Sequence, residues 1–316
     1  MRKSFAIVSL SLAILIGSLV VNRPAHACST VMLAKGPHLV FGHNRNENGI
    51  EVPGMVFINN RGVFKTGRTW SEMINQDRSD PSDLTWISRY GSVTFNAFGR
   101  DFPDGGMNES GLYIWEMNET ADFPKNPKLP KLMHMNWMQY NLDINSTIDE
   151  VIQSAKEIEI DGWTWQFFVA DSRGKSASIT FIDGEVVVNR DERMPVTALM
   201  NEPYDREIEL LRYFDGFGGR YPVDLDSMYT PRFAKAAVML RDFEPENDPV
   251  ECGFLILEKL TVSETPKWSV VFDFRAQIVY FKTRLNPQVK SFSLAEVDFA
   301  NTQPLQILNI DIDDGG

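Results

Sequence analysis

The chain has 316 residues and a formal net charge of −12 at pH 7, from 43 acidic and 31 basic side chains. This acidic balance argues against nucleic acid or an anionic membrane surface as a partner. The length suits one large domain or two small ones. We expect one domain over residues 28–316, because the sequence shows no Pro/Gly/Ser-rich linker, repeat or low-complexity run.

The first 27 residues are typical of a secretory signal peptide. Two basic residues precede an apolar stretch at residues 5–21, and Ala-His-Ala at residues 25–27 forms an A-x-A cleavage site. The pattern predicts removal of residues 1–27 and an exported protein, periplasmic or secreted, with no stable membrane insertion after cleavage. A membrane anchor is one alternative, although the apolar stretch is short for a span of ~20 residues. A lipoprotein signal is another, since such signals also end just before a cysteine, here Cys28.

The chain after this leader begins with a predicted β-hairpin, in which residues 29–34 and 39–43 flank the turn Lys-Gly-Pro-His. A second hairpin is predicted at Asp183-Gly184, because this pair suits a type I′ turn. We expect further strands at residues 92–98, 111–117, 163–170, 176–182, 185–189, 268–274, 277–283 and 290–294.

Helices are predicted between these groups of strands. The helix at 146–158 has one apolar face, with Ser146 or Thr147 as its N-cap. Further helices are expected at residues 204–214, 231–243 and 250–261. Strand runs flank blocks of helix without regular β–α alternation, which indicates an α+β fold with antiparallel sheets. Helices over the outer faces of two stacked sheets would suit this pattern.

The chain contains only two cysteines, Cys28 and Cys252. An exported protein could join them in a disulfide. However, Cys252 lies in the predicted helix at 250–261, where a free cysteine packs as a small apolar residue. Cys28 would then be a free thiol at the start of the exported chain, and such a thiol suggests chemistry.

A cysteine nucleophile needs a base or a depressed pKa. Three histidines follow the leader, His38, His43 and His134, and none has an evident catalytic or metal-binding spacing. Removal of the leader would supply another base, because a free α-amine has a pKa near ~8. An N-terminal Cys28 would therefore be nucleophile and base in one residue. The alternative is that a leader happens to end at a cysteine.

Five stretches, in this order along the chain, carry a resemblance to a known family. They are CSTVMLAKGPHLVFGHNRNEN (28–48), DGGMNESGLYIWEMNET (104–120), ADSRGKSASITFI (170–182), TALMNEP (197–203) and YTPRFAKAA (229–237). The chain resembles the choloylglycine hydrolase and penicillin V acylase family of N-terminal nucleophile hydrolases. The resemblance implies a four-layer αββα sandwich with antiparallel sheets, hydrolysis of a linear carbon–nitrogen amide bond without metal or cofactor, and a homo-oligomer, which is a tetramer in the family.

The resemblance also gives a role to four residues. Cys28 matches the nucleophile, Asn118 a residue whose backbone N–H lines the oxyanion hole, and Asn201 the asparagine whose side-chain amide is the second donor. Arg232 matches an arginine that helps to hold the site electrostatically. Acyl transfer requires such donors at the developing oxyanion. Without the resemblance, Asn118 could be a turn residue and Asn201 could cap the next helix.

Arg232 is also unusual by itself. Thr230 and Pro231 are the predicted N-cap and N1 residues of the helix at 231–243. Arg232 then lies in the first turn and faces the positive end of the helix dipole, at a cost of about 0.3–1 kcal/mol. A carboxylate or another local partner would explain this placement, and a solvated arginine is the alternative.

The sequence departs from the family after the first hairpin. Asn46 stands where the family has an Asp that accepts a hydrogen bond from the N-terminal amine, and His43 stands where it has an Arg. An amide oxygen can still accept, but it brings no charge, and Arg45 or Glu47 could recover one. This departure weakens a bile-salt assignment more than the enzyme class. We expect Asn46 among the catalytic residues and His43 at the substrate.

Aromatic residues could form an acyl pocket. Trp115 is expected at the substrate, and Trp70 and Trp86 could join it, although aromatic residues near strands commonly belong to the core.

These observations predict an exported N-terminal cysteine amidohydrolase that works through an acyl-Cys28 thioester. Its substrate would be a small N-acyl compound: a conjugated bile acid, penicillin V, an N-acyl homoserine lactone or an N-acyl amino acid. An acyltransferase of the same fold is the alternative among enzymes. The alternative from another class is a lipid-anchored binding protein in which Cys28 is acylated and inert.

Overall fold

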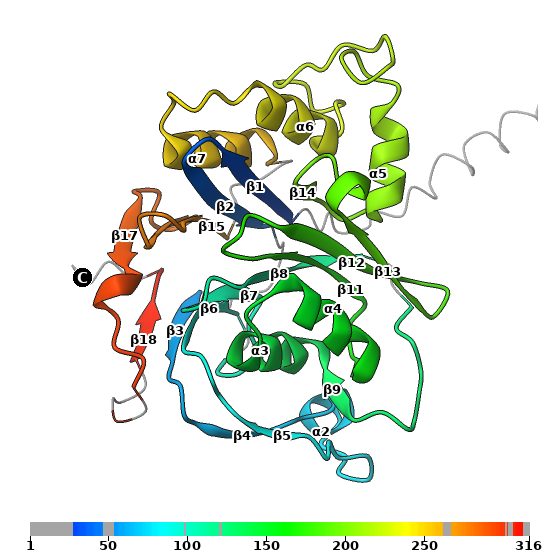
Figure 1. Ribbon diagram of the computed structural model, residues 1–316, viewed down its shortest axis with the longest axis vertical. Helices are drawn as coiled ribbons and strands as arrows, with labels where there is room; N and C mark the ends of the chain where they lie inside the picture. Colours follow the sequence, from blue (N-terminus) through cyan, green and yellow to red (C-terminus); the bar gives the residue numbers. More distant parts are fainter. Residues whose placement is uncertain are drawn as a thin grey trace, which may run out of the picture.

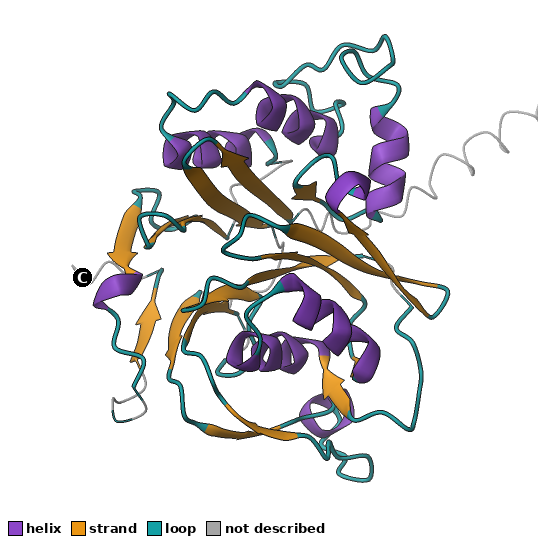
Figure 2. Cartoon of the chain, viewed as in Figure 1, coloured by secondary structure: helices purple, strands orange, loops and turns teal. Residues whose placement is uncertain are grey.

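Two antiparallel sheets stack at the centre of the protein, and helices cover their outer faces (Figures 1 and 2). This computed structural model describes residues 28–46, 54–97, 99–119, 122–261, 267–300, 302 and 306–311. Helices α6 (Arg232–Asp242) and α7 (Pro249–Lys259) lie on one sheet, and α3 (His134–Ile144) and α4 (Ile148–Glu157) lie on the other. The predicted α+β sandwich, with its helix–sheet–sheet–helix order, is confirmed.

The six-stranded sheet carries the start of the described chain. Its order is β14 (Ala198–Leu199), β1 (Ser29–Lys35), β2 (His38–Arg45), β15 (Trp268–Asp273), β16 (Ile278–Thr283) and β17 (Lys290–Ser293). The first two strands in the chain, β1 and β2, form the predicted hairpin. Their register pairs Ser29 with Asn44, so the preceding residue, Cys28, lies beside Arg45.

The eight-stranded sheet faces the first one. Its order is β13 (Glu185–Arg190), β12 (Ser176–Ile182), β11 (Trp165–Ala170), β8 (Tyr113–Asn118), β7 (Gly105–Asn108), β6 (Ser92–Asn96), β3 (Met55–Asn59) and β18 (Gln306–Asn309). The turn between β12 and β13 has positive φ angles at Asp183 (52°) and Gly184 (73°), as a type I′ turn requires. The predicted hairpin is therefore confirmed. Two small sheets complete the β-structure: β4 (Phe64–Thr66) with β5 (Thr85–Ile87), and β9 (Lys131–Met133) with β10 (Glu159–Asp161).

The helices begin and end largely where the sequence indicates. In α4 the N-cap is Thr147, one of the two predicted candidates, and its side chain forms a capping box with Glu150. In α6 the N-cap is Pro231 and the first helical residue is Arg232. The prediction of Thr230 as N-cap and Pro231 as N1 is therefore wrong by one residue. The other helical segments are α2 (Trp70–Ile74), α5 (Tyr204–Leu211), and the 3₁₀ turns Asp191–Arg193 and Leu294–Glu296.

Helix α3 was not predicted from the sequence. Nine of its eleven residues are buried, so no continuous polar face marks the helical period. Its N-cap, Met133, makes no side-chain capping bond. Both usual signals of a helix, amphipathic spacing and a polar cap, are therefore missing.

Two apolar cores hold the four layers together. The first lies between the sheets and beneath α6 and α7, and it contains Cys28 and Trp115. The second lies between the eight-stranded sheet and α3 and α4, and it contains Trp137 and Trp165. Cys252 is half-buried on α7 against the first core, and it forms no disulfide with Cys28.

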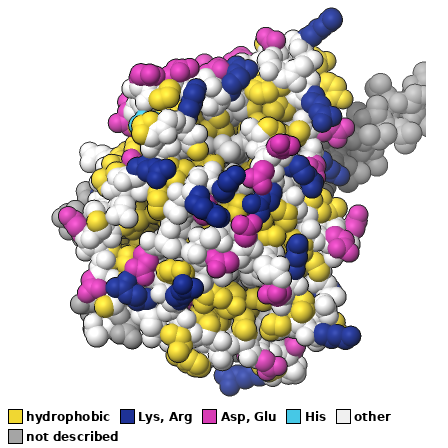
Figure 3. Space-filling view, viewed as in Figure 1, with side chains coloured by type: hydrophobic (Ala, Val, Ile, Leu, Met, Phe, Trp, Pro, Cys, Tyr) yellow, Lys and Arg dark blue, Asp and Glu magenta, His cyan; other side chains and the backbone are white. Residues whose placement is uncertain are grey.

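The surface mixes charges of both signs. Acidic and basic side chains are interspersed over the face shown in Figure 3, without a continuous basic region. Within the described ranges, no helix is both long and apolar enough to cross a membrane.

Gly105 allows the closest packing within the eight-stranded sheet. A Cβ atom at this position would lie 2.1 Å from Cδ2 of Trp115, which is fully buried. The indole of Trp115 therefore occupies the space where any other residue at position 105 would place its side chain.

We expect Gly105→Ala to lower the free energy of unfolding by about 1–3 kcal/mol, because the added methyl group overpacks the core. Gly253→Ala is the matched control. In α7 a Cβ at this position would meet Val271 at an ordinary 3.4 Å, and alanine is favoured over glycine inside a helix by about 1 kcal/mol. Urea denaturation should show a loss only for the first variant, and equal stability of both would contradict the packing described here.

Candidate active site

Cys28 lies at the start of β1, within the core between the two sheets. The residue is only 3% exposed. Burial, and then the charge of Glu116, raise the pKa of its thiol to about 12. Arg45, a hydrogen bond from the Asn46 backbone N–H, and Arg232 act in the opposite direction. A thiol in these surroundings becomes a nucleophile at neutral pH only if a base takes its proton.

Arg232 connects Cys28 to the next predicted site residue. Its Nη1 donates to the Cys28 carbonyl oxygen and to Ser29 Oγ, each at 2.8 Å, and its Nη2 donates to Asn201 Oδ1 at 2.9 Å. The planar guanidinium can reach these acceptors together because its donors are fixed in a fork. One side chain of α6 thus holds the start of β1 and the segment that follows β14.

The amide of Asn201 is fixed in one orientation. Its oxygen accepts from Arg232, and its Nδ2 donates to the Asn118 carbonyl oxygen at 2.7 Å. The reverse orientation would place an amide nitrogen against the guanidinium, which has no acceptor. An Asn amide carries two N–H groups, so the second N–H of Asn201 is available to a further acceptor.

Asn118 ends β8 with its backbone N–H directed away from β11. On the β11 side, Trp165 pairs with Asn118, and the next residue, Glu119, donates to Thr164 O at 3.3 Å. Backbone N–H groups alternate between the two sides of an antiparallel strand, so the Asn118 N–H points to the other side. On that side the preceding N–H group with the same direction, that of Glu116, donates to the Asp104 carbonyl oxygen at 3.2 Å. This orientation suits a donor to a bound group.

The side chain of Asn118 is also held. Trp165 Nε1 donates to Asn118 Oδ1. The structure therefore brings together Cys28, Asn118, Asn201 and Arg232, the four residues to which the resemblance gives catalytic roles. Asn46 lies beside them through its backbone N–H. The roles themselves remain predictions.

Glu207 is the acidic residue that acts on Arg232. It lies on α5, is buried, and interacts electrostatically with Arg232. Burial raises the pKa of Glu207 from its usual 4.5 to about 7, against the opposing effect of Arg232. The sequence indicates the need for such a partner but not its identity.

His43 and Trp115 are core residues in this structure. Their rings stack at 4.0 Å, both are fully buried, and His43 Nδ1 lies 2.8 Å from Thr30 Oγ1. Burial, and then Arg45, hold the pKa of His43 well below its usual range. These contacts favour the packing interpretation of both residues, and their role at a substrate remains a prediction.

The other aromatic and histidine candidates are engaged elsewhere. Trp86 is buried and donates to Asp143 Oδ2 at 2.7 Å, whereas Trp70 is half-buried. His38 Nε2 lies 2.8 Å from the Pro245 carbonyl oxygen, and buried His134 contacts the Asp161 carbonyl oxygen through Nδ1.

A group of buried charges beside Cys28 was not predicted. Arg45 forms ion pairs with Asp104 and with Glu116, the second at 3.5 Å between Nη1 and Oε1. Asp104 also accepts from the Ala97 backbone N–H at 2.6 Å. The sequence contains one signal of this group, which is Glu116 within a strand of otherwise apolar residues. A carboxylate buried in such a strand needs a charged partner. Glu47, the other residue expected to restore a charge, lies outside the described residues.

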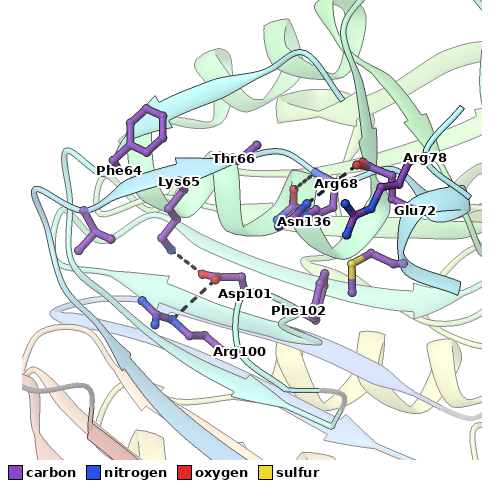
Figure 4. Close-up of a pocket in the computed structure, with 12 residues that line it drawn as sticks. Phe64, Lys65, Thr66, Arg68, Glu72, Arg78, Arg100, Asp101, Phe102 and Asn136 are labelled. Atoms are coloured by element: carbon purple, nitrogen blue, oxygen red, sulfur yellow. Dashed lines mark hydrogen bonds and ion pairs between the residues drawn. The ribbon is translucent and has the colours of Figure 1, made fainter. Parts of the chain in front are cut away.

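A separate pocket of about 570 Å³ lies beside β4. Figure 4 shows Lys65, Arg100 and Asp101 at this pocket, and Lys65 Nζ pairs with Asp101 at 2.8 Å. Lys65 also pairs with Asp143 at 3.1 Å. None of the predicted site residues lines this pocket, so it is distinct from the group of residues around Cys28.

Comparisons with known proteins bear on both the sequence and the fold. No protein-family model matches the chain. The chain is 25% identical, over 266 residues and 69% of each protein, to the penicillin V acylase of Pectobacterium atrosepticum. The structure of penicillin V acylase from Agrobacterium tumefaciens matches with a TM-score of 0.74 and 20% identity, over 89% of this chain and 91% of that one.

A variant of conjugated bile acid hydrolase from Clostridium perfringens also matches. Its TM-score is 0.68 at 17% identity, over 89% of this chain and 97% of that one. At these identities the two structures establish the fold, which this chain shares.

The raised pKa of Glu207 predicts how stability depends on pH. Below pH 4.5 the carboxyl is protonated in both folded and unfolded states. Between pH 4.5 and 7 the unfolded chain loses this proton while the folded protein keeps it, so stability falls as the pH rises. Glu207→Gln removes this effect, and its free energy of unfolding relative to wild type should rise over this range by up to about 3 kcal/mol.

Urea denaturation at several pH values measures this difference. Glu209→Gln, an exposed change on the same helix, is the control. A difference between Glu207→Gln and wild type that stays constant with pH would contradict a raised pKa at Glu207.

Proposed function

We propose that this chain, whose resemblance to the choloylglycine hydrolase and penicillin V acylase family the comparisons confirm, hydrolyses a linear amide bond with Cys28 as nucleophile. The curated relative is a penicillin V acylase, and the similar structures are those of a penicillin V acylase and a conjugated bile acid hydrolase. The observation that carries the proposal is the hydrogen-bonded series from Cys28 through Arg232 and Asn201 to Asn118.

The proposal includes export and cleavage before Cys28. The sequence pattern at residues 25–27 supports cleavage there, and the leader itself lies outside the described residues. Cleavage would leave a free α-amine on Cys28, two bonds from the carbon that carries the sulfur. This amine is the base that the buried thiol needs.

The reaction follows from this arrangement. The Cys28 amine, through a water molecule, takes the thiol proton, and the sulfur attacks the amide carbonyl carbon. The oxyanion accepts hydrogen bonds from the Asn118 backbone N–H and from the second N–H of Asn201. The carbon–nitrogen bond then breaks, and the leaving amine takes the proton from the Cys28 ammonium. Water, deprotonated by the same amine, attacks the acyl-Cys28 thioester and releases the acid.

The proposed substrates are small N-acyl amides. Hydrolysis of penicillin V, glycine- and taurine-conjugated bile acids, N-acyl homoserine lactones and N-acyl amino acids should be compared in one panel. Addition of a second amine separates hydrolysis from acyl transfer, since a transferase would form a new amide in place of the free acid. Absence of amide cleavage for every member would count against the proposed activity.

We expect that one additional residue before Cys28 abolishes turnover and leaves the fold intact. The α-amine becomes an amide and can no longer take the thiol proton, and general-base assistance is worth about 10²–10⁴ in rate. The experiment compares a protein that retains one alanine before Cys28 with a protein processed to a free Cys28. Intact mass verifies both starts, and thermal melting verifies that both are folded.

A folded, alanine-extended protein that hydrolyses its amide at a comparable rate would refute the N-terminal nucleophile mechanism. A diacylglycerol adduct on Cys28 would instead favour the lipid-anchored binding protein.

Asn201→Ala should lower kcat by about 10²–10³ with little change in KM, because an oxyanion donor acts mainly in the transition state. Asn247→Ala removes the same side chain from an exposed loop and should keep full activity. A change confined to KM would assign Asn201 to substrate binding or packing.

A further inference from the structure

The buried charged residues beside Cys28 suggest what replaces the aspartate for which this chain has Asn46. We propose, on the basis of the proposed function, that Glu116 is a positioning residue whose carboxylate, held by Arg45, supplies the negative charge that Asn46 cannot bring to the Cys28 amine. Arg45 and Glu116 would act together as a charge pair between the nucleophile and the oxyanion site.

The position of Glu116 links the two functional strands. It lies on β8, two residues before Asn118, and its Oε1 is 3.5 Å from Nη1 of Arg45. Arg45 ends β2 at the place where the β1–β2 register sets it beside Cys28. The ion pair therefore connects β8, the strand that ends with Asn118, to Arg45, the residue beside Cys28.

Burial makes these charges effective. The side chains of Arg45, Asp104 and Glu116 are 4%, 0% and 2% exposed. Charges shielded from water act on each other far more strongly than surface charges do. Two acidic side chains, those of Asp104 and Glu116, therefore lie against one guanidinium in the buried group next to Cys28.

The charged groups that act on Cys28 divide by sign. Arg45 and Arg232 favour the thiolate, and Glu116 opposes it. The two arginines by themselves would also disfavour a protonated amine, and proton transfer from sulfur to nitrogen forms such a cation. A carboxylate at Glu116 stabilises that ammonium ion and so keeps the amine basic. Asn46 offers only an amide oxygen, which accepts a hydrogen bond without a charge.

A purely structural role for this ion pair makes a different prediction. Removal of one partner of a buried pair destabilises the protein, but it need not change how the reactivity of Cys28 depends on pH. The two interpretations are therefore separated by the reactivity of the thiol rather than by stability.

The experiment measures alkylation of Cys28 by iodoacetamide as a function of pH. All proteins start at Cys28 and carry Cys252→Ala, so that only one thiol reacts. In Glu116→Gln the pH of half-maximal rate should fall by about one unit, because a negative charge near the thiol is lost. The acidic limb of kcat/KM should move to lower pH as well, since the amine loses the charge that stabilises its protonated form.

Glu119→Gln is the matched control. Glu119 lies one residue beyond Asn118, and the charges that act on it are those of Glu202 and Arg206. Its replacement should leave the Cys28 alkylation profile unchanged. An equal shift in both variants would mean that Glu116 has no special role.

A folded Glu116→Gln protein with an unchanged midpoint would overturn the inference. Should this variant fail to fold, the double variant Arg45→Gln/Glu116→Gln is compared with Arg45→Gln. The double variant should react at the lower pH of the two, and coincident profiles would again overturn the inference. Alkylation requires no substrate, so this failure is distinct from the absence of amide hydrolysis, which would count against the proposed function.

Discussion

The site depends on the guanidinium of Arg232. Three of its hydrogen bonds join the backbone of Cys28 and the side chain of Ser29, at the start of β1, to the amide of Asn201, which lies far along the chain. The first of these bonds is made to a carbonyl group, so it holds the nucleophile whatever the state of its sulfur. The last fixes which end of the Asn201 amide faces Asn118. Glu207, on the neighbouring helix α5, interacts electrostatically with this buried guanidinium.

Burial then decides the chemistry open to Cys28. Removal of the thiol from water raises its pKa so far that the arginines nearby do not restore an ordinary value. A site of this kind gains from a base that is attached to the nucleophile itself, because such a base needs no separate ordering. Of the three histidines, His43 lies nearest along the strands, and it is fixed in the core against Trp115 and Thr30.

Much of the fold was predictable from local signals. The β1–β2 hairpin, the turn at Asp183-Gly184 and the capped helix α4 follow from turn residues, caps and periodicity. Helix α3 and the short strands β7 and β9 were not predicted. The helix is buried on nearly all sides, and the two strands have only three to four residues, so neither shows a hydrophobic period that can be detected.

Some residues of the candidate site could likewise be predicted from the sequence, and others could not. Cys28, Asn118, Asn201 and Arg232 stand in short motifs that can be matched one at a time. Asp104 and Glu116 became visible only when the fold placed them against Arg45, since their pairing depends on which strands meet and not on any local pattern.

The order of strands in the six-stranded sheet has a consequence for how the protein folds. The central pair of this sheet joins β2, near the start of the described chain, to β15 at residues 268–273. Loop closure over such a distance is entropically costly, and folds dominated by non-local pairing form slowly. The middle of this sheet therefore cannot form until nearly the whole chain is available. Until then β2, which pairs with the strand that begins beside Cys28, has no partner on its other side, so the sheet around the nucleophile stays incomplete.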